Sequence, residues 1–173
     1  ACEEFRTTEK IYGYLMNIGI NAVIGKEGTG VVGLVEGLRP GGTVALRGDI
    51  DALPMQEEGN CGYKSVETGK MHACGHDVNL ACVLGAGEVL NRLKDKIKGN
   101  VKLIFQPAEE TLEGARRMIE GGALKNPPVD ACVAIHAWPD IPVGKVSVND
   151  GHAFASVDNF KITVKGKGGH GGI

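Results

Sequence analysis

Three short apolar segments of this chain each lead into polar side chains of the kinds that bind metal ions. The segments are rich in β-branched residues, and this predicts strands, with the second and third segments buried. Open α/β sheets form their sites at the carboxyl ends of strands, so we expect these polar groups to meet there. The alternative, that the aspartates are solvated loop acids, is equally open at this stage. In chain order, residues 43–46 are followed by Asp49 and Asp51, residues 101–105 by Glu109 and Glu110, and residues 130–135 by His136.

The segments between these strands have helical periodicity and end near glycines. This alternation, with 27 glycines available for turns between short elements, predicts an α/β fold with a mixed, mostly parallel sheet flanked by helices. A turn is expected at residues 39–42, which contain a Pro-Gly-Gly sequence. The expected helices cover residues 3–18, 80–94 and 112–120, and two further short strands are expected at residues 21–24 and 30–36.

The pattern changes beyond Pro142. Residues 157–164 alternate apolar and polar side chains, which is typical of a half-exposed strand in an antiparallel sheet. A single strand is not stable by itself, so this segment predicts the start of a second domain. We therefore predict one domain over residues 1–153 and the beginning of another over residues 154–173.

Composition argues against several classes of function. The net charge is −2 without a basic block, which disfavours binding to nucleic acid or to an anionic membrane. No apolar stretch reaches the roughly 18 residues of a membrane span. The five cysteines are scattered singly without a CxxC pair, which argues against a disulfide framework and a thiol redox protein, and favours a reducing, cytoplasmic setting. A small-molecule partner is the remaining expectation.

The segment MHACGHD, residues 71–77, concentrates residues that ligate metals. A lone Cys74 is more often a small buried apolar residue than a ligand. Together with His76, His136 and one of the two neighbouring glutamates, however, it supplies the thiolate, imidazole and carboxylate groups that zinc accepts. The other glutamate then stays free as a base that takes a proton from water. The residues alone leave open which glutamate has which role.

Two glycine-rich motifs carry weaker predictions. Residues 25–30 (GKEGTG) lack the Lys-Ser/Thr ending of a phosphate-binding loop, so we interpret them as a hairpin turn. Residues 166–171 (GKGGHG) match a dinucleotide-binding pattern, but no helix or ribose-binding acid follows. Within them, His170 is equally compatible with an imidazole that reaches a substrate and with a solvated loop residue.

Six motifs in a fixed order resemble the zinc aminoacylase and carboxypeptidase superfamily. The similarity is to its amidohydrolase branch, which includes hippurate hydrolases, N-acyl-amino-acid deacylases and auxin-conjugate hydrolases. The motifs extend over nearly the whole chain, and six in order are far more specific than any one. They are RGDIDALPMQE (47–57), GKMHACGHD (69–77), VKLIFQPAEE (101–110), GAL (122–124), AIHAWPDIPVGKV (134–146) and ITVKGKGGHGG (162–172).

The resemblance implies hydrolysis of the amide bond of N-acyl amino acids at a site with two divalent ions. Zinc is the expected metal, with manganese, cobalt and nickel as alternatives. Cys74 resembles the bridging thiolate ligand. The further implied ligands are His76, Glu110 and His136. Glu109 resembles the general base that deprotonates water and passes the proton to the leaving amine.

The resemblance also implies roles outside the ligand set. Asp51 resembles an acidic residue that orients a ligand, and the role of Asp49 is less defined. His170 resembles a histidine of the lid domain that binds the substrate carbonyl oxygen or carboxylate, often across a dimer. This implies that residues 154–173 begin a lid and dimerisation domain of α+β type, and that the full-length form is a homodimer.

The chain departs from the family pattern in two ways. Asn79 stands where family members usually carry the second histidine of a GHDxH motif, which changes a contact but no ligand. Family enzymes are also much longer, so we expect this chain to be the N-terminal portion, without the last histidine ligand and most of the lid. An inactive fragment or a non-catalytic metal-binding module is therefore the alternative function.

Overall fold

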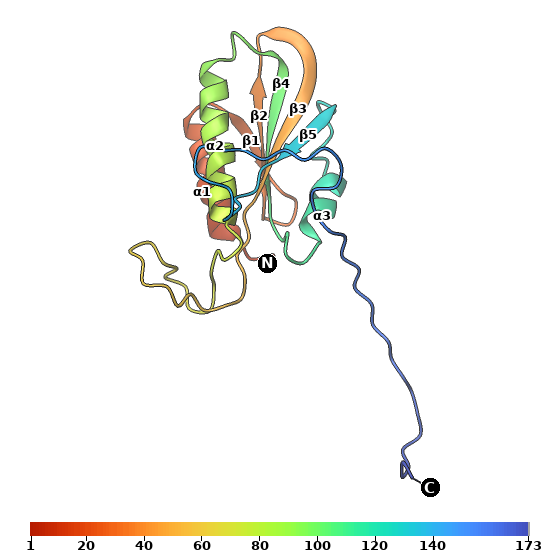
Figure 1. The fold of residues 1–173 in the computed structure, drawn as a ribbon. Helices are drawn as coiled ribbons and strands as arrows, with labels where there is room; N and C mark the ends of the chain where they lie inside the picture. The colour runs from red at the N-terminus through yellow and green to blue at the C-terminus, as the bar shows by residue number, and fades with distance from the viewer. Residues whose placement is uncertain (173) are drawn as a thin grey trace. The chain divides into compact units, whose positions relative to one another are not determined.

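The computed structural model describes residues 1–172, in two units that divide between residues 138 and 139. The first unit contains all the helices and strands of the described residues (Figure 1). In chain order they are α1 (Phe5–Asn17), β1 (Asn21–Ile24), β2 (Val31–Glu36), β3 (Arg39–Asp49), α2 (His76–Arg92), β4 (Lys98–Gln106), α3 (Gly114–Glu120) and β5 (Ala131–Ala134).

The strands form one mixed sheet in the order β1-β2-β4-β3-β5. The predicted α/β class with a mixed sheet is confirmed, but the sheet is not mostly parallel. β3 pairs in parallel with β4 and with β5, whereas β1–β2 and β2–β4 are antiparallel. The short links after β1 and after β2 each reverse the chain direction, whereas α2 and α3 form the longer crossovers that keep β3, β4 and β5 parallel. Because β4 runs parallel to β3, it is antiparallel to β2. As a result β3, β4 and β5 all end at the same edge of the sheet.

Apolar side chains cover both faces of β4, the central strand. Leu103 and Phe105 are fully buried in a cluster with residues of α1, α2 and β2, on the face that these helices cover in Figure 1. Ile104 points the other way, into a smaller cluster with Met118 of α3. This period of two is what a strand between two layers of helices requires. Helix α2 approaches very closely, since a Cβ at Gly87 would lie 2.4 Å from the Leu103 side chain.

Three local predictions differ from the structure. Residues 39–42 are not a turn but lie within β3, where the register with β4 shifts between Arg39 and Thr43, so a bulge accommodates the Pro-Gly-Gly sequence. The last strand is not buried, because β5 lies at an edge of the sheet and all four of its residues are exposed. Residues 157–164 form no strand, since the described part of the second unit contains no other strand to pair with them.

The second unit, residues 139–173, has neither helix nor strand in its described part. The predicted domain boundary after residue 153 and the assignment of the following residues to a lid remain predictions. In residues 1–172, no helix combines the length and apolar character needed to cross a membrane.

Candidate metal centre

The carboxyl ends of three parallel strands and the first turn of α2 meet around His76. Its imidazole belongs to two groups of potential metal ligands, each with ligand atoms within 4.8 Å of one another. One group adds Cys74 and His136, and the other adds Glu109 and Glu110. The structure thus brings together the four predicted ligands and the predicted base, although their individual roles stay predictions.

Contacts to Asp51 fix the protonation pattern of the His76 ring. Nδ1 lies 3.0 Å from both the carboxylate Oδ1 and the backbone carbonyl oxygen of Asp51, and a carbonyl oxygen can only accept, so Nδ1 carries the proton. In the neutral ring, Nε2 then carries the lone pair. The residue is 1% exposed, and Nε2 has no hydrogen-bond partner within the described residues. A buried nitrogen lone pair without a donor suits a metal ion, and the carboxylate on the opposite nitrogen is the usual support for a histidine ligand.

The ring of His136 is oriented in a similar way. Its Nδ1 lies 2.7 Å from the carbonyl oxygen of Ala137, so that nitrogen donates, and in the neutral ring Nε2 carries the lone pair. Nε2 is 3.6 Å from the Cys74 sulfur, and the ring packs edge-on against His76 with centroids 5.7 Å apart. Both imidazoles therefore present the same type of nitrogen to the space beside the thiol.

Gly75 gives the backbone the shape that places Cys74 and His76 on the same site. Its φ of +79° lies in the left-handed region that favours glycine, immediately before the first residue of α2. A Cβ there would lie 3.3 Å from the Cβ of Ala137, because the loop after β5 passes close by. The short spacing Cys-Gly-His thus forms a turn that leads directly into the helix.

Burial and accumulated negative charge shift the pKa values of Cys74, Glu109 and His76. Burial, and then the charges of Glu110, Glu109 and Asp49, raise the pKa of Cys74 to about 11. Burial and the neighbouring Glu110 carboxylate likewise raise the pKa of Glu109. For His76, burial acts against the charged form, but the hydrogen bond and charges of the surrounding carboxylates raise its pKa. A divalent cation would relieve this repulsion, so the donor set fits a metal centre.

Asp51 connects the two halves of the site. Its Oδ2 accepts a hydrogen bond from the backbone N–H of Glu110 at 3.1 Å, while its Oδ1 faces His76. Burial alone would raise the pKa of this carboxyl, but the hydrogen bonds from His76 and from the backbone of Glu110 and Glu109 lower it. The carboxylate therefore stays ionised and ties the helix start to the end of β4.

A hydrogen-bonded chain beside the ligands was not predicted from the sequence. Asp49 is fully buried, and its two oxygens accept from Arg47 Nη1 at 2.7 Å and from Asn79 Nδ2 at 2.6 Å. Arg47 also donates from Nε to Gln106 of β4 at 2.9 Å. The spacing of Arg47 and Asp49 by two residues along β3 places both on one face and is the sequence pattern that indicates this pair.

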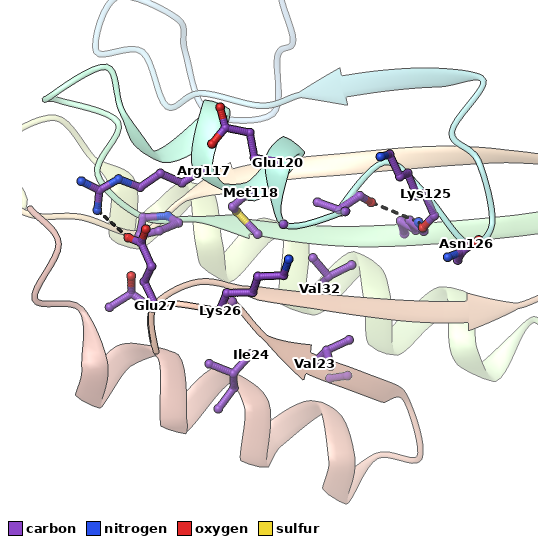
Figure 2. Close-up of a pocket in the computed structure, with 18 of the residues that line it drawn as sticks. Val23, Ile24, Lys26, Glu27, Val32, Arg117, Met118, Glu120, Lys125 and Asn126 are labelled. Atoms are coloured by element: carbon purple, nitrogen blue, oxygen red, sulfur yellow. Dashed lines mark hydrogen bonds and ion pairs between the residues drawn. The ribbon is translucent and has the colours of Figure 1, made fainter.

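Neither ligand group includes His170, which belongs to the second unit. Its role at the substrate stays a prediction. A cavity of about 800 Å³ lies between β1, β2 and α3, where Val23, Val32 and Met118 contribute apolar walls (Figure 2). None of the candidate metal ligands lines this cavity, so it is separate from the two ligand groups around His76.

Residues 45–170 match the sequence profile of Peptidase family M20/M25/M40. The chain belongs to this family. The resemblance inferred from the six ordered motifs is therefore confirmed.

Relatives in this family include N-acetylcysteine deacetylase of Bacillus subtilis, which is 44% identical over 99% of the chain. An N-acyl-L-amino acid amidohydrolase of Geobacillus stearothermophilus is 37% identical over 99%. A crystal structure of a dinuclear metal-binding M20 peptidase from Bacillus subtilis superposes with a TM-score of 0.83 and 41% identity, over 87% of this chain and 42% of that one. The chain covers 45% and 46% of the first two relatives, so it spans less than half of their length.

Proposed function

We propose that this chain carries part of the active site of a metal-dependent amidohydrolase that splits N-acyl amino acids into a carboxylic acid and an amino acid. The observation that carries the proposal is the buried Nε2 of His76, which has no hydrogen-bond partner among the described residues and lies at the junction of the two ligand groups. Such an atom is costly to bury unless something binds it, and the groups around it are a thiol, an imidazole and two carboxylates.

Cys74, His76, Glu110 and His136 would hold the metal, and we propose two divalent ions with zinc as the natural choice. Divalent ions supply a Lewis acid for the amide carbonyl and make water acidic enough to be deprotonated near neutral pH. The thiol and imidazole ligands favour zinc, whereas the carboxylates also suit manganese, cobalt or nickel. The solved M20 relative, described as a dinuclear metal-binding peptidase, supports this assignment.

Glu109 is the proposed general base. Its raised pKa, caused by burial and by the adjacent Glu110 carboxylate, brings it closer to the range in which a carboxylate can accept a proton and release it again. In the proposed reaction, a Glu109 oxygen first takes a proton from water and then delivers it to the leaving nitrogen. Asp51 holds His76 in the required orientation during both steps.

The relatives support small N-acyl amino acids as the substrate class. Those at 37–44% identity include enzymes named for N-acetylcysteine, N-acyl-L-amino acids and amino-acid conjugates. We further propose that His170 contacts the substrate, that the natural protein is a homodimer and that it acts in the cytoplasm. The five cysteines, all free, are in keeping with a reducing compartment. The alternative of a non-catalytic module is not favoured by relatives that are named as hydrolases and deacetylases.

The test uses the natural gene product, assayed for release of the amino acid from N-acetyl and N-benzoyl amino acids, with and without a chelator. Glu109→Gln should lower turnover by about a hundredfold or more while the metal content stays unchanged. Cys74→Ala should lower the metal content as well as turnover. Hydrolysis that is insensitive to the chelator, or absent from the metal-loaded wild type, would refute the proposal. Loss of metal from Glu109→Gln would mean that the two glutamates have exchanged roles.

A further inference from the structure

The side chain of Asn79 lies at the centre of the contacts between α2, β3 and the loop after β5. The residue is on the first turn of α2, three positions after His76, and is 1% exposed. Residues three apart lie on one helix face, so Asn79 faces the same side as this histidine. Packing around it is tight, since a Cβ on Gly48 would lie only 3.0 Å from the backbone oxygen of Asn79.

Both ends of the Asn79 amide are used, in an orientation that its partners dictate. The backbone N–H of Ala137 donates to Oδ1 at 2.7 Å, and Nδ2 donates to Oδ1 of Asp49 at 2.6 Å. A backbone N–H can only donate and an ionised carboxylate can only accept, so the amide cannot be flipped without losing both contacts. The side chain therefore acts as a bridge from a donor to an acceptor.

The Ala137 end of this bridge leads to a candidate ligand. Ala137 follows His136 directly, and its carbonyl oxygen holds Nδ1 of that ring at 2.7 Å. The residue is thus held at its N–H by Asn79 and at its carbonyl by His136. The last contact of the backbone with β3 before this point is the longer bond from the Ile135 N–H to the Arg47 carbonyl, at 3.3 Å. β5 itself is a four-residue edge strand that, among the described strands, pairs only with β3 and has every residue exposed, so α2 provides a second anchor beyond its end.

The Asp49 end of the bridge leads to the other imidazole. With Arg47 on one oxygen and Asn79 on the other, Asp49 is held with Oδ1 3.8 Å from Nε2 of His76. The Asp49 carboxylate thus stays beside Nε2 of His76, the nitrogen proposed to bind the metal, at a distance too long for a hydrogen bond. Its two anchors keep it from moving closer.

We propose that Asn79 is a positioning residue that sets the geometry of His136 and Asp49 around the metal, a role that rests on the proposed function. An amide suits this role because it combines a donor with an acceptor and carries no charge. An aspartate at this position would still accept from Ala137 but would face Asp49 with a second negative charge. A leucine would offer neither contact, whereas a neutral imidazole has one donor and one acceptor and can replace both.

The experiment measures metal binding to the natural gene product, by competition with a chromophoric chelator for Zn²⁺ and by the absorption spectrum of the Co²⁺ form. Asn79→Leu and Asn79→Asp should lower Zn²⁺ affinity about 10- to 100-fold, the usual effect of removing a residue that orients a ligand. They should also change the Co²⁺ ligand-field bands, because His136 shifts while the thiolate-to-cobalt band persists. Asn79→His should recover most of the affinity.

The matched control is Asn91→Leu on the same helix. Asn91 donates from Nδ2 to the Ile18 carbonyl oxygen at 2.8 Å, away from the ligands, so its replacement removes a comparable bond without touching the site. It should leave affinity and spectrum unchanged. Wild-type affinity and spectrum in Asn79→Leu, or an equal loss in Asn91→Leu, would overturn the inference. If Asn79→Leu does not fold, Asn79→Asp and Asn79→His decide the matter by their difference. A wild type that binds neither ion would instead overturn the proposed function, and this inference with it.

Discussion

The metal-free protein should lose stability at alkaline pH through Cys74. Its pKa is raised from 9.0 to about 11 by burial and by the charges of Glu110, Glu109 and Asp49. A group whose pKa is higher in the folded state contributes stability that is complete below its unfolded value and is lost as the pH rises through the folded value. The contribution is therefore complete below pH ~9, and about 2 kcal/mol of it should be lost by pH ~10.5.

The assay compares urea unfolding of the chelator-treated wild type with Cys74→Ser from pH ~8 to ~10.5. Serine keeps the size of the side chain but does not titrate in this range, so other alkaline groups cancel in the difference between the two proteins. The wild type should lose about 2 kcal/mol more than the variant. Zn²⁺ binding at pH ~8 should release one proton more from the wild type than from Cys74→Ser. At that pH only about one Cys74 thiol in a thousand is ionised before the metal binds.

Two results would refute this reasoning. Parallel stability curves for the wild type and Cys74→Ser would mean that the thiol has an ordinary pKa and that the carboxylates do not act on it. Equal proton release from the two proteins would mean that the thiol does not bind the metal as thiolate. Calorimetry in buffers of different ionisation enthalpy measures this release directly.

Three further predictions concern single side chains. Gly75→Ala should destabilise the fold by about 1–2 kcal/mol and weaken metal binding, because Gly75 has a positive φ and lies close to Ala137. The control, Gly85→Ala, has open space around it and should be neutral or stabilising in thermal unfolding. Asp51→Ala should lower Zn²⁺ affinity about 10- to 100-fold in the chelator competition, and unchanged affinity would contradict its support of His76. Burial lowers the pKa of Lys102, whose Nζ donates to the carbonyl of Ala123 at 3.0 Å. Just below pH ~10.5 the unfolded chain therefore binds more protons than the folded protein, so the folded state gains stability as the pH rises. In urea unfolding, the free energy of the wild type should rise relative to that of Lys102→Met, by no more than about 1.4 kcal/mol per pH unit. An equal slope in both proteins would refute this last prediction.

Much of the fold can be read from local sequence patterns. Residues 21–24 are a strand as predicted, and the helix expected at residues 3–18 is observed as Phe5–Asn17, because period and turn residues are local properties. The exposure of β5 is not local. Residues 130–135 are as apolar as a central strand, and only the strand order of the sheet places them at an edge.

The same distinction applies to the site. Strand ends predict that the carboxylates and His136 converge, and the structure brings them together around His76. The bridging role of Asn79 could not be predicted, since its partners are 30 and 58 residues away along the chain. A departure from the family motif indicated that the position matters, but its contacts depend on three elements that meet only in space.

The strand order also determines when this site can form during synthesis. β4 lies between β2 and β3, although these two strands are neighbours in sequence. The first 49 residues therefore contain three strands, but β3 has to wait for β4, which ends at residue 106, before it can join the sheet. Pairing of such distant segments is slow because the chain must close a long loop first. Cys74 leaves the ribosome before Glu109, Glu110 and His136, which follow the ends of β4 and β5. Its thiol is therefore exposed to metals and oxidants in solution until these residues have been synthesised.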